Sequence, residues 1–110
     1  MHARVVNLQV KPGMGQEAVK RYEKSVDNSV RAPGYKLGIL LTNPETGKAF
    51  SITLWETKEQ VLEGNVSGYY KKQMETMGDV WAEPPVLEDY QVSMFYVHDL
   101  PSSTVKPPKS

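Results

Sequence analysis

The chain has 110 residues and no cysteine, and its 13 Lys and Arg balance 13 Asp and Glu to a formal net charge of zero. A length of about 100 to 150 residues is typical of one domain, and the even charge argues against a nucleic-acid-binding protein, which usually has a basic stripe. The missing cysteine excludes disulfides, thiolate nucleophiles and cysteine-ligated metal centres. No apolar run approaches the roughly 20 residues that cross a bilayer. No signal peptide is visible either, so the sequence predicts a cytoplasmic protein that binds no membrane.

An alternating segment over residues 3–10 predicts the first strand, with Leu8 and Asn7 on opposite faces. The Lys-Pro-Gly-Met-Gly segment at 11–15 predicts a turn. Residues 16–31 follow it with helical spacing and predict the first helix. The apolar stripe of that helix consists of Val19, Tyr22, Val26 and Val30.

Residues 35–42 predict the second strand, and the segment 43–48, which contains Pro and Gly, predicts a hairpin connection. The segment 49–57, Ala-Phe-Ser-Ile-Thr-Leu-Trp-Glu-Thr, predicts a third strand that ends at a tryptophan and leads directly into a helix. Thr57 and Gln60 have the spacing of a capping box at the start of that helix.

The second helix is predicted to begin at residue 58, to break at Gly64-Asn65 and to resume beyond it. Residues 90–97 predict the last strand. Residues 99–110 are rich in Pro and Ser, which predicts a tail that is disordered or lies against a partner. Residues 1–98 are then a single domain.

The predicted order β-α-β-β-α-β is that of the ferredoxin-like α+β fold. Right-handed crossovers place the first and third strands at the centre of a four-stranded antiparallel sheet, with both helices on one face. The other face carries apolar residues such as Val5 and Phe50, and an apolar face needs a cover. We therefore expect a homodimer, in which a second copy supplies that cover.

Three segments carry a resemblance to a known family: the Lys-Pro-Gly turn before the first helix, the Ala-Pro-Gly-Tyr segment before the second strand, and Thr-Gly-Lys-Ala-Phe-Ser-Ile-Thr-Leu-Trp-Glu-Thr. Through them, residues 3–97 resemble the antibiotic-biosynthesis monooxygenase-like family of dimeric α+β barrels. The resemblance implies that two sheets pair into a barrel and that each subunit has a small apolar cavity between sheet and helices. Activities in such proteins range from cofactor-independent oxygenation to haem degradation, so the fold alone does not fix the function.

The haem-degrading members use an Asn on the first strand, and a Trp and a His on the second helix. Alignment of the Pro-Gly turns places Val6 at the Asn position, and residues 58–80 contain neither Trp nor His. The comparison therefore argues against haem, and we expect neither a cofactor nor a metal.

The predicted ligand-binding residues lie on the third strand and the two helices: Trp55, Thr53, Tyr22, Tyr69, Tyr70 and Met74. Trp55 would line a cavity for an aromatic compound and donate its indole N–H to a ligand oxygen, or else anchor the strand end in the core. Tyr69 and Tyr70 would donate hydrogen bonds from a segment that opens as a lid, or belong to the core stripe and the surface. Tyr22 and Met74 are expected to face the sheet.

His2 and His98 fall at the ends of two strands that are predicted to be antiparallel neighbours. With Asp99 they would form a metal site or a base, although exposed surface histidines are the plainer interpretation. Further polar residues on the first strand are expected at the interface between subunits, with a pocket role as the alternative: Arg4, Asn7 and Gln9.

Two functions follow from these observations. One is a cofactor-independent monooxygenase for a small phenol- or quinol-like compound, for which the helix side of the sheet offers tyrosines, Ser51 and Thr53 but no identified base. The other is a non-catalytic homodimer that holds a small apolar or aromatic molecule or has a structural role.

Overall fold

A computed structural model describes residues 1–29, 32–67, 71, 75 and 78–99. The elements are β1 (His2–Gln9), α1 (Gly15–Ser29), β2 (Tyr35–Thr42), β3 (Lys48–Trp55), α2 (Lys58–Ser67), the 3₁₀ helix η1 (Gly78–Val80) and β4 (Val86–Gln91). The strands form an antiparallel sheet in the order β2-β3-β1-β4. The predicted ferredoxin-like fold is confirmed, with the first and third strands at the centre of the sheet.

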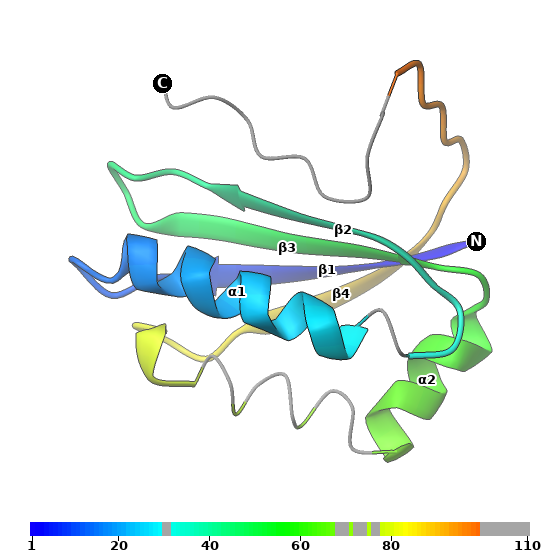
Figure 1. The fold of residues 1–110 in the computed structure, drawn as a ribbon, viewed down its shortest axis with the longest axis horizontal. Coiled ribbons are helices and arrows are strands. Elements are labelled where there is room, and N and C mark those ends of the chain that lie inside the picture. The colour runs from blue at the N-terminus through cyan, green and yellow to red at the C-terminus, as the bar shows by residue number, and fades with distance from the viewer. Residues whose placement is uncertain (30–31, 68–70, 72–74, 76–77, 100–110) are drawn as a thin grey trace.

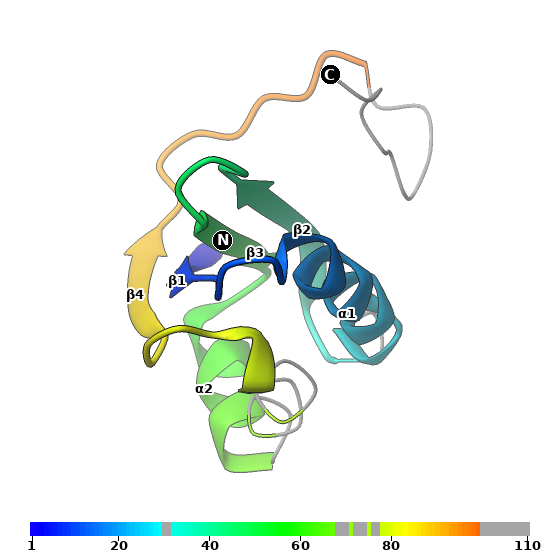
Figure 2. The same cartoon turned by 90° about the vertical axis from the view of Figure 1, so that its left-hand side faces the viewer.

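Both helices lie on the same face of the sheet, as predicted (Figure 1, Figure 2). The core lies between that face and α1, and it includes Val80 of η1 and the neighbouring Trp81. Its buried side chains are Leu8, Val10, Ala18, Ala49, Val80 and Trp81. The alternating pattern of β1 therefore points Leu8 inward, and Asn7 lies on the opposite face.

Arg21 links α1 to η1. Its guanidinium donates to Glu17 Oε1, one helical turn earlier, at 3.0 Å, and it forms an ion pair with Asp79 of η1. Because Val80 beside Asp79 is fully buried, this contact helps to hold η1 against the core. The predicted end of the helix at Val30 and Arg31 lies outside the described residues.

The predicted capping box begins α2. Thr57 Oγ1 accepts a hydrogen bond from the Gln60 backbone N–H at 3.2 Å, and Gln60 Oε1 accepts one from the Thr57 N–H at 3.1 Å. The predicted break at Gly64-Asn65 is wrong, because α2 continues through Ser67. A glycine inside a helix costs only about 1 kcal/mol relative to alanine, which an otherwise favourable helix tolerates.

The last strand is displaced from its predicted position. Residues 90–97 were expected to form it, whereas β4 spans Val86–Gln91. In the observed register His2 faces Gln91, and the Val92 N–H donates to the Met1 carbonyl at 3.0 Å. No residue of β1 stands opposite 93–97, so that segment leaves the sheet (Figure 1).

The sheet face away from the helices carries exposed apolar side chains, which are Ile39, Leu41, Val86 and Tyr90. The segment after β4 adds Met94, Phe95, Tyr96 and Val97, which are exposed as well. No helix among the residues that the structure describes has the length and apolar character to span a bilayer.

Candidate functional site

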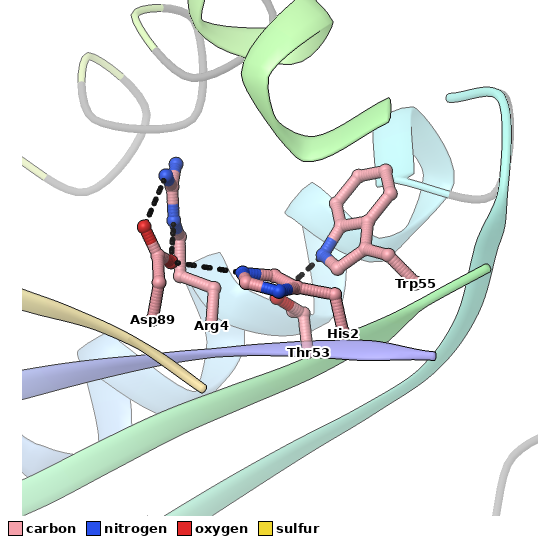
Figure 3. Close-up of polar contacts among 5 residues, drawn as sticks. All are labelled: His2, Arg4, Thr53, Trp55 and Asp89. Carbon is pink, nitrogen blue, oxygen red and sulfur yellow. Dashed lines mark hydrogen bonds and ion pairs between the residues drawn. The ribbon is translucent and has the colours of Figure 1, made fainter. Parts of the chain in front are cut away.

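Three neighbouring strands bring five side chains together at one end of the sheet, on the side that faces α2 (Figure 3). The register places Arg4 of β1 opposite both Thr53 of β3 and Asp89 of β4, and His2 opposite Trp55. Residues two apart on a strand share a face, so His2 and Arg4 lie on the face that Leu8 occupies. We call these residues the polar cluster: His2, Arg4, Thr53, Trp55 and Asp89.

Arg4 and Asp89 form a two-pronged ion pair. Arg4 Nε donates to Asp89 Oδ1 at 2.9 Å and Nη2 donates to Oδ2 at 3.2 Å. Hydrogen bonding to Arg4 lowers the pKa of the Asp89 carboxyl below its ordinary value of 3.8, and partial burial opposes that shift. The Arg4 side chain is 9% exposed and that of Asp89 is 36% exposed, so the pair reaches solvent on the β4 side.

His2 is the unexpected member of the polar cluster. The imidazole lies between the Asp89 carboxylate and the Trp55 indole (Figure 3), and the residue is only 7% exposed. Its Nε2 atom is 3.7 Å from Asp89 Oδ1 and has no hydrogen bond within the described part of the chain. The interpretation of His2 as a surface histidine is therefore wrong. A buried histidine and a carboxylate do lie on the helix side of the sheet, where none had been identified from the sequence.

Trp55 is buried and forms two contacts that fix its ring. Its indole Nε1 donates to Thr53 Oγ1 at 2.9 Å, and its ring meets Tyr35 edge to face, with centroids 5.4 Å apart and planes at 86°. The Trp55 and Tyr35 rings line one side of the polar cluster. Trp55 and Thr53 were both predicted as ligand-binding residues, and the structure brings them into contact.

Of the other predicted ligand-binding residues, only Tyr22 is among the described residues, and it is not part of the polar cluster. Tyr22 extends from α1 to the same strand, where its hydroxyl is 3.4 Å from Ser51 Oγ. Ser51 precedes Thr53 by two positions, so Tyr22 borders the same sheet face farther along β3. The remaining three lie outside the described residues: Tyr69, Tyr70 and Met74.

The polar residues of β1 divide between the two faces of the sheet. Asn7 donates to Glu88 Oε1 at 2.7 Å and Gln9 donates to the Thr46 carbonyl at 2.8 Å, both on the face away from the helices. Arg4 faces the helix side instead, so its expected grouping with Asn7 and Gln9 is wrong.

His98 is not the β4 neighbour of His2, because His2 pairs with Gln91 and β4 ends at that residue. Its Nδ1 is instead 3.0 Å from the Tyr96 hydroxyl. Within the described ranges, no three His, Asp or Glu side chains converge as a metal site would require. The metal site considered for His2, His98 and Asp99 does not form.

His2, Arg4 and Asp89 were missed as a group, although the sequence held part of the signal. His2 and Arg4 differ from Leu8 by an even number of positions, which places all three on one face of the first strand. Asp89 could not be assigned to the same face, because the last strand was predicted to begin at residue 90, just after Asp89. With the correct register, its position opposite Arg4 would have followed.

No family profile and no curated protein sequence matches this chain. Solved structures do match it. A protein from Bordetella bronchiseptica classed as an antibiotic biosynthesis monooxygenase has a TM-score of 0.75 at 19% identity, over 84% of this chain and 97% of the other. The chain has the fold of the antibiotic-biosynthesis monooxygenase-like proteins. The resemblance seen in the sequence is confirmed at the level of the fold.

Two further solved structures share this fold. A variant of SnoaB, a cofactor-independent oxygenase from Streptomyces nogalater, has a TM-score of 0.71 at 12% identity, over 86% of this chain and 94% of the other. A variant of MhuD, solved with two manganese protoporphyrin IX molecules per active site, has a TM-score of 0.73 at 19% identity, over 89% of this chain and 100% of the other. Both identities are too low to transfer an activity.

The described residues do not fit a haem site on α2. Haem iron in proteins is usually held by His, Cys, Met or Tyr, and α2 contains none of these between Lys58 and Ser67. The buried histidine is on β1 instead, where Asp89 and Trp55 flank its ring (Figure 3). We therefore derive no haem chemistry for this chain.

Proposed function

We propose that this protein is a homodimer that binds a small phenol- or quinol-like compound on the helix side of its sheet and oxygenates it without a cofactor. The observation that carries the proposal is the polar cluster, in which an aromatic wall stands beside ionisable groups. The Trp55 and Tyr35 rings suit a flat aromatic ligand. His2, Arg4 and Asp89 would act on the oxygen substituents of such a ligand.

The reaction needs little from the protein beyond binding and proton transfer. A deprotonated phenol is electron-rich enough to reduce O₂ itself. One oxygen atom enters the ring, and the other leaves as water with the two hydrogens that the phenol loses. The protein would orient the ring, exclude water and accept the hydroxyl proton. The fold shared with a cofactor-independent oxygenase supports this assignment.

The dimer is proposed from the sheet face that the helices leave open. Ile39, Leu41 and Val86 are exposed there, and apolar side chains grouped on one face are typical of protein interfaces. A two-fold arrangement would cover both copies of this face at once.

Oxygen uptake tests the reaction. Purified protein, freed of metals and flavins, is incubated with a panel of phenols and hydroquinones while O₂ and the quinone product are followed. We expect one O₂ consumed for each quinone formed, at a rate above that of heat-denatured protein. Trp55→Phe should weaken the apparent affinity, whereas Trp81→Phe, which alters a core tryptophan outside the polar cluster, should leave it unchanged.

Saturable binding without oxygen uptake would overturn the catalytic part of the proposal. The protein would then be the non-catalytic ligand-binding dimer that the sequence also allowed. Absence of both binding and uptake would leave a structural dimer as the remaining function.

A further inference from the structure

We propose that His2 is the proton acceptor of this site, that Asp89 and Arg4 are its positioning residues, and that the ligand is a phenol with an acidic hydroxyl. This inference rests on the proposed function, since it concerns the same site, but it adds the base that the sequence had left unidentified.

The first support is the missing hydrogen bond at Nε2 of the His2 imidazole. Nε2 of His2 is buried, and no described residue forms a hydrogen bond with it. Buried polar atoms in folded proteins nearly always have a partner, so an exception calls for an explanation. A ligand hydroxyl within about 2.6–3.2 Å of Nε2 would supply the missing bond, and that is the distance from which a base abstracts a proton.

The second support is the charge around the imidazole. Asp89 Oδ1 lies 3.7 Å from Nε2, so a proton taken up by this nitrogen would lie close to a carboxylate. Arg4 holds the same carboxylate through two hydrogen bonds, which keeps Asp89 ionised and fixed in place. The proton that leaves the phenol thus arrives on Nε2, beside a negative charge.

In the described part of the chain, the other charged groups at this end of the sheet are the ammonium of Met1, which precedes His2, and Glu56, which forms an ion pair with Lys36 at 2.9 Å. β3 supplies Thr53 and Trp55, which are neutral. α2 packs over this end of β1 and β3 and buries Val61, while its charged residues up to Glu63 are exposed. Asp89 is the carboxylate beside the His2 imidazole, and Arg4 holds it in place.

Access to the site is expected on the β4 side. The side chain of Asp89 is 36% exposed, whereas those of His2 and Arg4 are 9% exposed. A ligand that enters past Asp89 would meet Nε2 next, with the Trp55 ring behind it (Figure 3). Proton transfer from a phenol to a base becomes more favourable as the hydroxyl becomes more acidic. The site should therefore bind acidic phenols, and only those whose phenolate is also electron-rich should be oxygenated.

Nuclear magnetic resonance of the wild-type protein with 4-nitrophenol tests the inference directly. The chain has only two histidines, so His98 is an internal reference. With ¹⁵N-labelled imidazoles, addition of 4-nitrophenol should move the His2 nitrogens to imidazolium shifts and leave those of His98 unchanged. If the His2 resonances keep their neutral shifts at saturation, or if 4-nitrophenol does not bind, the inference is wrong.

Absorbance gives an independent measurement, because the nitrophenolate absorbs at a longer wavelength than the neutral phenol. Binding to the wild-type protein should lower the apparent pKa of 4-nitrophenol by about one unit, a tenfold change in its ionisation equilibrium. His2→Gln should abolish this shift, and His98→Gln should retain it. Asp89→Asn should reduce the shift while 4-nitrophenol still binds, whereas loss of a purely structural contact would weaken binding of the phenol and the phenolate alike. An equal shift in wild type and His2→Gln would overturn the inference.

Failure of the inference and failure of the proposed function give different results. If 4-nitrophenol binds as the phenolate but no phenol in the panel consumes O₂, His2 is the proton acceptor of a binding protein and the oxygenase proposal fails. If O₂ is consumed at the same rate by His2→Gln as by wild type, the oxygenase stands and His2 is not its base, since removal of a general base should slow turnover by roughly 10²-fold or more.

Discussion

Two buried tryptophans in this chain differ in what their indole nitrogens contact. Trp55 Nε1 donates to Thr53 Oγ1 at 2.9 Å, whereas Trp81 Nε1 has no hydrogen-bond partner among the described residues. Both side chains are largely buried. The same substitution made at each of the two tryptophans therefore separates the contribution of an indole hydrogen bond from that of aromatic burial.

We expect Trp55→Phe to reduce the free energy of unfolding by about 1 kcal/mol more than Trp81→Phe. Both variants lose aromatic volume, but only the first loses a hydrogen bond and leaves the Thr53 hydroxyl without its donor. Urea denaturation followed by far-UV circular dichroism would measure both. Equal losses would show that the Trp55 hydrogen bond contributes nothing net.

The Arg4–Asp89 ion pair predicts how stability depends on pH. The pKa of Asp89 is lower in the folded state than its ordinary value of 3.8, so between these two values the unfolded chain binds more protons. The contribution of the pair is therefore present above pH 3.8 and is lost as the pH falls through the folded-state pKa.

Asp89→Asn should cost about 1–2 kcal/mol at neutral pH, because it leaves Arg4 buried without its carboxylate, although the exposure of Asp89 reduces the cost. The difference from wild type should shrink as the pH falls below 3.8. Denaturation midpoints measured at several pH values would show this convergence. Glu83→Gln, at an exposed position shortly before β4, is the matched control, and a similar loss there would contradict this expectation.

At the scale of elements, Gly34 couples the start of β2 to the cap of α2. Its φ of +82° lies in the left-handed region, and a Cβ there would overlap the Gln60 side chain. Gln60 Oε1 is the atom that accepts the Thr57 N–H in the capping box. A side chain added at Gly34 would therefore strain the turn before β2 and displace Gln60 from the cap of α2.

Gly34→Ala should destabilise the fold by about 1–2 kcal/mol from the left-handed backbone alone, with a further loss from the displaced cap. Gly15→Ala is the control, since the start of α1 has no positive φ and no atom within 4 Å of the added Cβ. It should be neutral or stabilising by up to about 1 kcal/mol. In the Gln60→Ala background, the cost of Gly34→Ala should fall, and an unchanged cost would exclude the coupling.

The elements differ in how far their sequences define them. The capping box, the Pro- and Gly-containing turns and the alternating strands were predicted because each depends on local chemistry. β4 depends on long-range pairing: its position is set by the register against β1, which places Asp89 opposite Arg4. The polar cluster depends on the same register, which is why Thr53 and Trp55 were predicted and Asp89 was not.

At the scale of the whole molecule, the open sheet face is the surface that the proposed homodimer would cover. Leu41 on this face is 49% exposed, and Leu62 on α2 is 46% exposed, so the two leucines are matched in type and exposure. Only Leu41 would be covered in a dimer of paired sheets.

We expect Leu41→Glu to weaken self-association by about tenfold or more in Kd, because a charge would be buried at the interface. Leu62→Glu should leave it unchanged. Sedimentation equilibrium at micromolar concentration measures both. A wild-type protein that is monomeric under these conditions would refute the paired-sheet dimer.

β4 is an edge strand that pairs only with β1 in the described sheet, and it holds Asp89 over His2. Edge elements with exposed side chains open locally at a smaller free energy than the whole domain. The backbone amides of β4 should therefore exchange with deuterium before those of β1 and β3. A ligand that contacts both His2 and β4 would slow that exchange. The protection of the β4 amides against deuterium exchange would then measure the fraction of sites that are occupied.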